Sequence, residues 1–303
     1  MSDFRKALSA TRVYGELRYD EPMSSLTSFR IGGKAEILAA PRDTSELTSL
    51  LMAAKASGIP LFPLGAGANI LVADAGIPGL VIDMQNFDTI VRSGDSLIAG
   101  AGVRMNDLTE VAASRSLAGL EFIHGMPGSV GGSVWMNARC YETSLAERIE
   151  NVEVVGMDGS IRQLRPDVSE YSYKRSPFQR MEAIITSATF ALLPGDRDSI
   201  RAAMIERRLD RMRKGHYLAP SVGSIFKNNR AFGEPTGRII DSLGLRGFSI
   251  GDARVAEYHA NIVINTGAAT ASEILDVIKH IEARVLAERG LRLEREVLLV
   301  GAW

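Results

Sequence analysis

The chain has 303 residues, 46% of them hydrophobic, which is enough apolar material for two or three packed units. Its 35 basic and 36 acidic residues leave a formal charge of -1, and this balance argues against binding to nucleic acid or to a membrane surface. A single cysteine, Cys140, excludes an internal disulfide, and the four histidines lack the close spacing of a zinc or haem site, so no metal is expected.

Residues 1–82 predict a mixed α/β unit. Residues 1–19 hold no unbroken apolar run, so we expect neither a signal peptide nor a membrane span, and a cytoplasmic location fits best. Asp43 and Glu46 have the spacing of a capping box before an apolar stripe that stops at Gly58, which predicts a helix. Short apolar runs then predict buried strands at residues 59–64, 70–72 and 80–82.

Residues 83–200 predict a second, sheet-rich unit. The pattern indicates a strand at 97–103 and a helix at 106–117, followed by a glycine-dense segment, 119–132, where regular structure must pause. Asp158-Gly159 is a strong hairpin signal. The strands expected to pair around it are residues 152–155, 161–164 and 183–193.

Residues 201–303 predict the last unit, which a charged helix over residues 196–214 joins to the rest. An apolar run at 261–264 predicts a strand. Thr270 and Glu273 stand at capping-box spacing, and the helix that they open should end near Gly290. Residues 291–300 are expected to close the chain as one strand.

A first glycine loop joins two apolar runs. It reads Leu64-Gly65-Ala66-Gly67-Ala68-Asn69, and only such small side chains let consecutive main-chain N–H groups converge on a diphosphate. A Rossmann site is disfavoured because Ile70 continues as strand rather than opening a helix, and the Gly-Lys-Ser/Thr of a Walker A loop is absent. The alternative is a tight strand connection with no ligand.

A second glycine loop, Gly125-Met126-Pro127-Gly128-Ser129-Val130-Gly131-Gly132-Ser133, holds more glycines than a simple turn needs. Main chain must therefore approach something closely there. Together the two loops could supply phosphate donors and a flat contact surface, which is what a bulky dinucleotide requires. We therefore predict that the fold brings the two loops together.

Several short motifs follow one another along almost the whole chain. They are Thr27-Ser28-Phe29-Arg30-Ile31-Gly32-Gly33, Gly65 to Asn69, Gly125 to Gly132 with Asn137-Ala138, Tyr173 to Phe178, Gly223-Ser224-Ile225-Phe226-Lys227-Asn228, His259-Ala260-Asn261 and Leu293-Glu294-Arg295-Glu296-Val297. In this order they resemble the motifs of the UDP-N-acetylenolpyruvoylglucosamine reductase family, FAD enzymes that complete UDP-N-acetylmuramate for peptidoglycan.

The resemblance implies an α+β fold similar to that of vanillyl-alcohol-oxidase (PCMH-type) flavoproteins. Two α/β subdomains, 1–82 and 83–200, would bind FAD, and a C-terminal α+β domain, 201–303, would cover the substrate. The chain resembles the shorter form of the family, which lacks an inserted substrate loop. Hydride would pass from NADPH through FAD to the enolpyruvyl double bond of a UDP-sugar. The sequence leaves the oligomeric state open, and a monomer is favoured.

For the cofactor, the resemblance implies ligands in the first motif and in both glycine loops. The expected residues are Arg30, Gly65, Ala66, Gly67, Ala68, Asn69, Ile70, Gly125, Met126, Gly128, Ser129, Gly131 and Gly132.

The implied reaction needs a proton donor and groups that stabilise charge. Hydride added to the alkene pushes charge onto the carboxylate oxygens, and losing one donor to such an oxygen typically costs roughly 3 kcal/mol of barrier. By resemblance Ser224 is the proton donor and Glu296 the catalytic acid. A serine in a Gly-Ser pair can instead simply hydrogen-bond in a turn. In a closing strand, Arg292, Glu294 and Glu296 would share one face, and Glu294 is interpreted as a surface carboxylate.

Tyr173 resembles the substrate-positioning tyrosine of the family, but Lys174 follows where the family ordinarily has arginine. Lysine lacks the planar fork that grips a carboxylate through two hydrogen bonds. Either Lys174 or Arg175 could fill the role, and on a strand the two would face opposite ways, so we favour Lys174. Lys227 and Asn228 resemble ligands of the substrate diphosphate or sugar, whereas His259 is expected to pack or hydrogen-bond.

Two other functions stay open on the sequence. An oxidase of the same flavoprotein superfamily would need a base rather than an acid at the site. A non-catalytic flavin-binding relic is the other alternative: Lys174 is compatible with it, while Ser224 and Glu296 count against it.

Overall fold

The protein is described by a computed structural model that covers residue 8 and residues 15–303. Most of the expectation about residues 1–19 therefore lies outside the described residues. The chain forms two compact units. The larger takes in the described residues up to Asp20, Glu36–Ala66 and Gly79–Leu209, and the smaller takes in Glu21–Ala35, Gly67–Pro78 and Asp210–Trp303.

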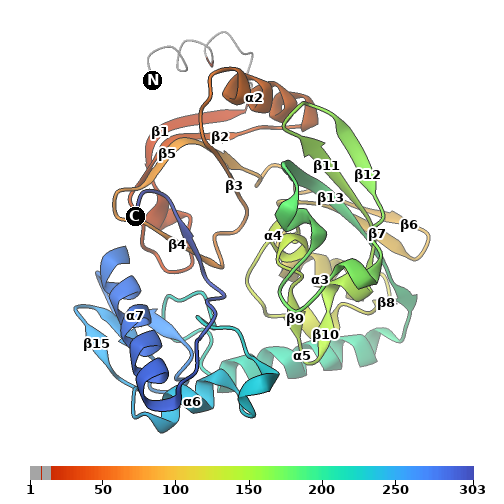
Figure 1. Cartoon of the computed structure of the whole chain (residues 1–303). Coiled ribbons are helices and arrows are strands. Elements are labelled where there is room, and N and C mark those ends of the chain that lie inside the picture. Colours follow the sequence, from red (N-terminus) through yellow and green to blue (C-terminus); the bar gives the residue numbers. More distant parts are fainter. Residues whose placement is uncertain (1–7, 9–14) are drawn as a thin grey trace. The chain divides into compact units, whose positions relative to one another are not determined.

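The first sheet has four strands in the order β1-β2-β5-β3 (Figure 1). They are β1 (Glu16–Pro22), β2 (Lys34–Ala40), β3 (Leu61–Leu64) and β5 (Ile77–Asp83), with β3 and β5 parallel. The predicted helix is α2 (Thr44–Ala56), and its apolar stripe is buried. The helix and strand predictions for this part of the chain are confirmed.

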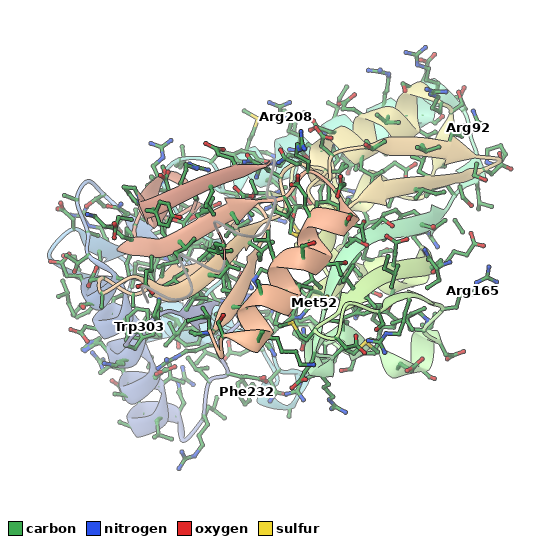
Figure 2. All side chains as sticks on the ribbon, turned by 90° about the horizontal axis from the view of Figure 1, so that it is seen from above. Met52, Arg92, Arg165, Arg208, Phe232 and Trp303 are labelled. Atoms are coloured by element: carbon green, nitrogen blue, oxygen red, sulfur yellow. The ribbon has the colours of Figure 1, made fainter. Side chains whose placement is uncertain are left out.

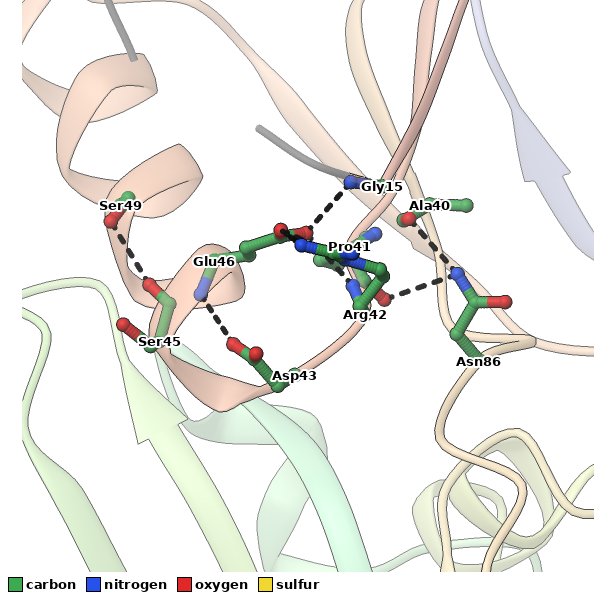
Figure 3. A network of polar contacts seen from close by, with 9 residues as sticks. All are labelled: Gly15, Ala40, Pro41, Arg42, Asp43, Ser45, Glu46, Ser49 and Asn86. Carbon is green, nitrogen blue, oxygen red and sulfur yellow. Dashed lines mark hydrogen bonds and ion pairs between the residues drawn. The ribbon is translucent and has the colours of Figure 1, made fainter. Parts of the chain in front are cut away.

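A buried carboxylate fixes the start of α2 (Figure 3). Asp43 caps the helix as predicted, accepting a hydrogen bond of 2.9 Å from the Glu46 N–H. Glu46, however, does not close a capping box. Its carboxylate accepts from the Gly15 and Arg42 N–H groups and pairs with the Arg42 guanidinium. Because Glu46 is only 6% exposed, these partners compensate the cost of burying its charge.

The second sheet has five antiparallel strands in the order β12-β11-β13-β7-β6. They are β6 (Ile90–Ser93), β7 (Ser96–Gly100), β11 (Ile149–Gly156), β12 (Ile161–Leu164) and β13 (Ala183–Ala191). The predicted hairpin is confirmed, since Val155 pairs with Ile161 across the Asp158-Gly159 turn. Figure 2 labels Arg92, which lies on β6, and Arg165, which follows β12.

The hairpin turn packs against α2. A Cβ at Gly159 would lie 3.0 Å from Thr48 Cγ2 and 3.4 Å from Met52 Sδ, and the Gly159 φ is +81°. Figure 2 shows Met52 on α2. The turn therefore requires glycine for its main-chain conformation, and the close approach of the helix adds to that need.

Short elements complete the larger unit. They are α3 (Met105–Ser114), β8 (Leu117–Ala118), α4 (Val130–Trp135), β9 (Arg139–Cys140), β10 (Thr143–Ser144) and β14 (Leu193–Pro194). α4 packs against β13 and β7. The predicted pause in regular structure is therefore too long, because α4 already begins at Val130 and includes Gly131 and Gly132.

The smaller unit combines a three-stranded antiparallel sheet with a parallel strand pair. Its elements are β4 (Ile70–Val72), α6 (Thr236–Ser242), β15 (Ser249–Ile250), β16 (Ala253–Val255), β17 (Val263–Asn265), α7 (Ala271–Arg289) and β18 (Leu298–Val300). α7 packs on β15, β16 and β17. It opens with the predicted capping box at Thr270 and ends at Gly290, whose φ is +68°.

Two further predictions concern the charged helix and the closing strand. The charged helix is confirmed as α5 (Arg197–Arg213), whose buried side chains are Ile200 and Met204. The closing strand is shorter than predicted, because only residues 298–300 form it, in parallel with β4. Glu294 and Glu296 lie outside this strand, so the alternation of side chains along a strand does not predict which way they point.

Candidate functional site

The first glycine loop connects β3 to β4 and keeps its main-chain donors uncommitted. Within the described residues, the N–H groups from Gly65 to Asn69 donate no hydrogen bond to the protein, whereas the carbonyl groups of Gly67 and Asn69 do accept. If this loop were only a strand connection with no ligand, these N–H groups would have only water as a partner. A run of uncommitted N–H groups on small residues is the arrangement that binds an anion.

The two glycine loops meet in the larger unit. A Cβ on Gly65 would overlap the Ser129 hydroxyl and lie 3.9 Å from the Gly132 nitrogen. The sequence predicted this meeting, although the loops are far apart along the chain.

The second loop is mostly committed to the protein itself. The N–H of Gly125 donates to the Asn106 side chain at 2.8 Å, and the Gly131 N–H donates to the Ala101 carbonyl at 2.8 Å. Gly131 also has a packing reason to be glycine, since its Cβ would lie 2.9 Å from that of Ala101. Within the described residues, Gly128 and Ser129 keep uncommitted N–H groups. The loop is thus chiefly a close-contact surface.

Arg30 lies in a turn of the smaller unit that adjoins Gly67. The Ser28 N–H donates to the Gly67 carbonyl at 3.0 Å, and Arg30 itself is exposed with a φ of +57°. A left-handed arginine is uncommon and indicates that the surrounding turn holds it there.

Tyr173 and Lys174 form the corners of a tight turn, not a strand. Ser172 and Arg175 exchange two main-chain hydrogen bonds of 3.1 and 3.0 Å around them, and Lys174 has a φ of +57°. The preference between Lys174 and Arg175 assumed a strand, in which their side chains would face opposite ways. That assumption is wrong, because these residues lie in a turn. Lys174 is half-buried, whereas Arg175 is exposed.

Ser224 lies in an extended segment of the smaller unit, where it forms a bridge to Ile262. Its side chain is half-buried, and within the described residues its hydroxyl makes no hydrogen bond. The preceding Gly223 has a φ of +78° and open space where a Cβ would be. The alternative of a serine spent on a turn hydrogen bond is thus wrong, and the hydroxyl remains available to a ligand.

Glu296 is fixed beside this segment through its main chain. Its N–H donates to the Ile225 carbonyl at 2.7 Å, and its carbonyl accepts from Asn69 Nδ2 at 3.0 Å. Hydrogen bonds to Ile225 and Asn69 therefore connect Glu296 to the neighbour of Ser224 and to the last residue of the first glycine loop. All these groups belong to the smaller unit.

Lys227 is not a solvated surface charge. Its side chain is 13% exposed, its ammonium pairs with the Glu294 carboxylate at 2.8 Å, and its main-chain N–H donates to the Glu294 carbonyl. The interpretation of Glu294 as a mere surface carboxylate is incomplete, because this residue orients Lys227. Asn228 uses its side-chain oxygen to accept from the Thr236 N–H at 3.0 Å, at the start of α6.

Asn261 is a residue to which the sequence gave no role. It is 3% exposed, and its side chain accepts from the Phe226 N–H at 3.0 Å and donates to the Phe226 carbonyl at 2.8 Å. The sequence did contain a signal for this role, because Asn261 begins an apolar run and a buried amide must find hydrogen-bond partners. It holds the segment that carries Ser224.

His259 lies beside Asn261, and a second histidine, His216, lies near His259. The His259 ring accepts from the Asn261 N–H at 3.2 Å, and the His216 ring centroid is 6.3 Å from that of His259. Burial lowers the pKa of His259. Burial lowers the pKa of His216 to about 4, with contributions from Arg211 and His259. Both rings are therefore neutral packing and hydrogen-bonding groups near neutral pH, as expected for His259.

Acid should destabilise the protein through His216. Its folded pKa of about 4 lies below the unfolded value of 6.5, so the unfolded chain binds the proton first as the pH falls. Stability should be complete above about pH 7 and decline from about pH 6.5 towards about pH 4. Urea unfolding of wild type and His216→Gln across this range measures the effect. The free energy of unfolding of the variant should fall less steeply as the pH drops, and above about pH 7 it should depend on pH as it does in wild type. Parallel curves throughout would contradict the assignment.

Neither a metal centre nor a membrane span is found among residues 8 and 15–303. No cluster of three or more His, Cys, Asp or Glu side chains there could hold a metal ion. No helix in that part of the chain is both long and apolar enough to cross a bilayer.

Sequence profiles of two domains match the chain. One, described as "FAD binding domain", matches residues 35–165, and the other, described as "UDP-N-acetylenolpyruvoylglucosamine reductase, C-terminal domain", matches residues 214–300. The expected FAD-binding domain is thereby confirmed.

Relatives of the chain are similar over nearly their whole length. UDP-N-acetylenolpyruvoylglucosamine reductase of Treponema denticola is 39% identical over 306 aligned residues, which cover 95% of both chains. The enzyme of the same name from Pediococcus pentosaceus is 40% identical and covers 93% of both. The 303-residue length and this coverage fit the predicted short form.

Solved structures confirm the predicted fold. The crystal structure of UDP-N-acetylenolpyruvylglucosamine reductase from Thermus caldophilus has a TM-score of 0.79 at 32% identity, covering 94% of this chain and 98% of that one. Xylooligosaccharide oxidase from Myceliophthora thermophila has a TM-score of 0.51 at 16% identity over 63% of this chain and 43% of that one, a likeness of fold alone. By its sequence and its fold, the chain belongs to the UDP-N-acetylenolpyruvoylglucosamine reductase family.

Proposed function

We propose that the chain catalyses the FAD-dependent reduction of UDP-N-acetylglucosamine enolpyruvate to UDP-N-acetylmuramate by NADPH. The similarity to named reductases over 95% of both chains carries the proposal. The hydrogen bond from the Glu296 N–H to the carbonyl next to Ser224 supports it, because it fixes an acid and a hydroxyl on adjoining segments.

We propose that main-chain amides of the first loop hold the cofactor diphosphate. The N–H groups of Gly65, Ala66, Gly67, Ala68 and Asn69, uncommitted within the described residues, fit an anion, and all but the last belong to glycine or alanine. The other proposed ligands are Arg30, Ile70, Gly125, Met126, Gly128, Ser129, Gly131 and Gly132. When bound there, FAD would accept hydride from NADPH and deliver it to the alkene.

The chain's own side chains would manage charge and protons. Ser224 Oγ would give its proton to the alkene carbon that does not receive hydride. Glu296 would polarise the substrate carboxylate, on which charge accumulates. Tyr173 and Lys174 would bind and orient that carboxylate, with Lys174 favoured over Arg175 because it is the less exposed of the two. Lys227 and Asn228 would bind the UDP portion.

The remaining parts of the proposal concern organisation. Residues 1–82 and 83–200 would act as the FAD-binding subdomains and residues 201–303 as the substrate-binding domain. The protein would work as a monomer in the cytoplasm, where its single thiol, Cys140, stays reduced.

An absorbance spectrum tests this function. The purified protein should be yellow, bleach on addition of NADPH without substrate, and recolour when the enolpyruvyl UDP-sugar is added under anaerobic conditions. An oxidase of the same superfamily would instead be bleached by a hydroxylated substrate and recoloured by oxygen. A spectrum that NADPH does not change would exclude the reductase.

A further inference from the structure

The turn that carries Tyr173 and Lys174 adopts a conformation that its own sequence does not favour. Lys174 is left-handed at φ +57°, at a corner where such turns prefer glycine or asparagine. A residue in this region persists only where its surroundings hold it. The hydrogen bonds that hold the turn are therefore informative.

Asn137 fixes one side of the turn. Its Nδ2 donates to the Ser172 carbonyl at 3.0 Å, while its Oδ1 accepts from the Ala146 N–H at 3.1 Å. The side chain is 3% exposed, so each of these bonds replaces one to water that burial has removed. Asn137 is itself left-handed at φ +44°, a conformation that asparagine tolerates better than most residues.

Gln179 fixes the other side. Its Nε2 donates to the Lys174 carbonyl at 3.2 Å and to the Trp135 carbonyl at 2.9 Å. The Ser176 hydroxyl donates to the same Trp135 carbonyl at 2.6 Å. Trp135 is the last residue of α4, and Ser129, in the second glycine loop, caps the start of that helix.

One short helix therefore joins the second glycine loop to the turn. Ser129 starts α4, the Trp135 carbonyl at its end accepts from Ser176 and Gln179, and Asn137 follows two residues later. Both ends of this connection lie in the larger unit. A lysine, which lacks the arginine fork, depends on its main chain to bring a single point charge to a carboxylate.

We propose that Asn137 and Gln179 are positioning residues, which hold the Lys174 turn at a fixed place relative to α4 so that its ammonium meets the substrate carboxylate. The inference rests on the proposed function. Neither residue touches the substrate in this scheme; both act through the main chain of residues 172–174.

Amide hydrogen exchange measures how firmly the turn is held, and it does so independently of catalytic turnover. Gln179→Ala and Asn137→Ala, each of which removes the side-chain amide donor, should each accelerate exchange in the peptide containing residues 172–175. Gln163→Ala, on the exposed strand β12 of the same unit, is the matched control and should leave that peptide unchanged. Unchanged exchange in both positioning variants would overturn the proposal, whatever their activity.

A double-mutant cycle measures the consequence. Gln179→Ala should lower kcat/KM by about tenfold in the wild-type background, but by less than about twofold when Lys174 is already alanine. Flavin content should be the same in all variants. Equal losses in both backgrounds, or faster exchange with unchanged kcat/KM, would overturn the positioning role.

Failure of the proposed function looks different. If wild type does not turn over the enolpyruvyl UDP-sugar, the reductase assignment fails, and with it the carboxylate role of Lys174. If wild type turns over normally but the effects in the double-mutant cycle are additive, the reductase assignment stands and only the positioning role of Asn137 and Gln179 is rejected.

Discussion

Ser224→Ala is expected to leave reduction of the flavin by NADPH nearly unchanged and to slow its reoxidation by substrate by about 10²- to 10⁴-fold. The reason is that hydride transfer from NADPH to the flavin needs no proton from Ser224, whereas hydride transfer from the flavin to the alkene yields the saturated product only when the other alkene carbon is protonated. The hydroxyl has no hydrogen-bond partner within the described residues, so its loss leaves no buried group unsatisfied and should cost little stability.

Stopped-flow absorbance of the two half-reactions separates these effects. Ser249→Ala is the control, because Ser249 is an exposed serine on β15 of the same unit. Both variants should bind the same amount of flavin as wild type. Wild-type reoxidation in Ser224→Ala would remove this residue from the mechanism.

Gly67→Ala should yield protein with little or no bound flavin. Its φ is +61°, and a Cβ there would overlap the main-chain carbonyl oxygen of Leu26, which cannot rotate away as a side chain could. The left-handed conformation alone costs a non-glycine residue about 1–2 kcal/mol, and the overlap forces the loop to shift in addition. A shifted loop would no longer present its N–H groups to a diphosphate.

Gly94→Ala isolates the contribution of conformation. Gly94 has the same φ of +61°, but nothing lies within 4 Å of the position that its Cβ would take. Urea unfolding should show a loss of about 1–2 kcal/mol for Gly94→Ala and a larger loss for Gly67→Ala, with flavin retained only in the former. Equal stability and equal flavin content would show that the loop tolerates the side chain and would contradict its role.

Local signals in the sequence determined much of the fold. The Asp43 cap, the Thr270 capping box, the Gly290 stop and the Asp158-Gly159 hairpin all lie where the pattern indicated. Each depends on hydrogen bonds or φ preferences within a few residues, so neighbouring residues suffice to specify it.

Local sequence signals gave the wrong conformation where residues distant in the sequence determine it. Residues 291–297 have the composition of a strand, yet only residues 298–300 pair with β4, whereas Arg295 forms an isolated antiparallel bridge to Phe226. A continuous strand needs one neighbour that offers hydrogen bonds in register along its whole length. Lys174 follows the same rule: a turn anchored by Asn137 and Gln179 overrides the extended conformation expected for it.

The order of motifs was sufficient to identify the family and the types of residue at the site, because glycine loops and an acid or hydroxyl at fixed places are visible in one dimension. Tertiary structure alone decided which polar groups are free to act. It commits the N–H groups of Gly125 and Gly131 to the protein, pairs Lys227 with Glu294, and leaves the N–H groups from Gly65 to Asn69 uncommitted among the residues that the structure describes. The physical reason is that a buried donor or acceptor takes whichever partner folding brings within hydrogen-bond distance, and sequence separation does not enter that choice.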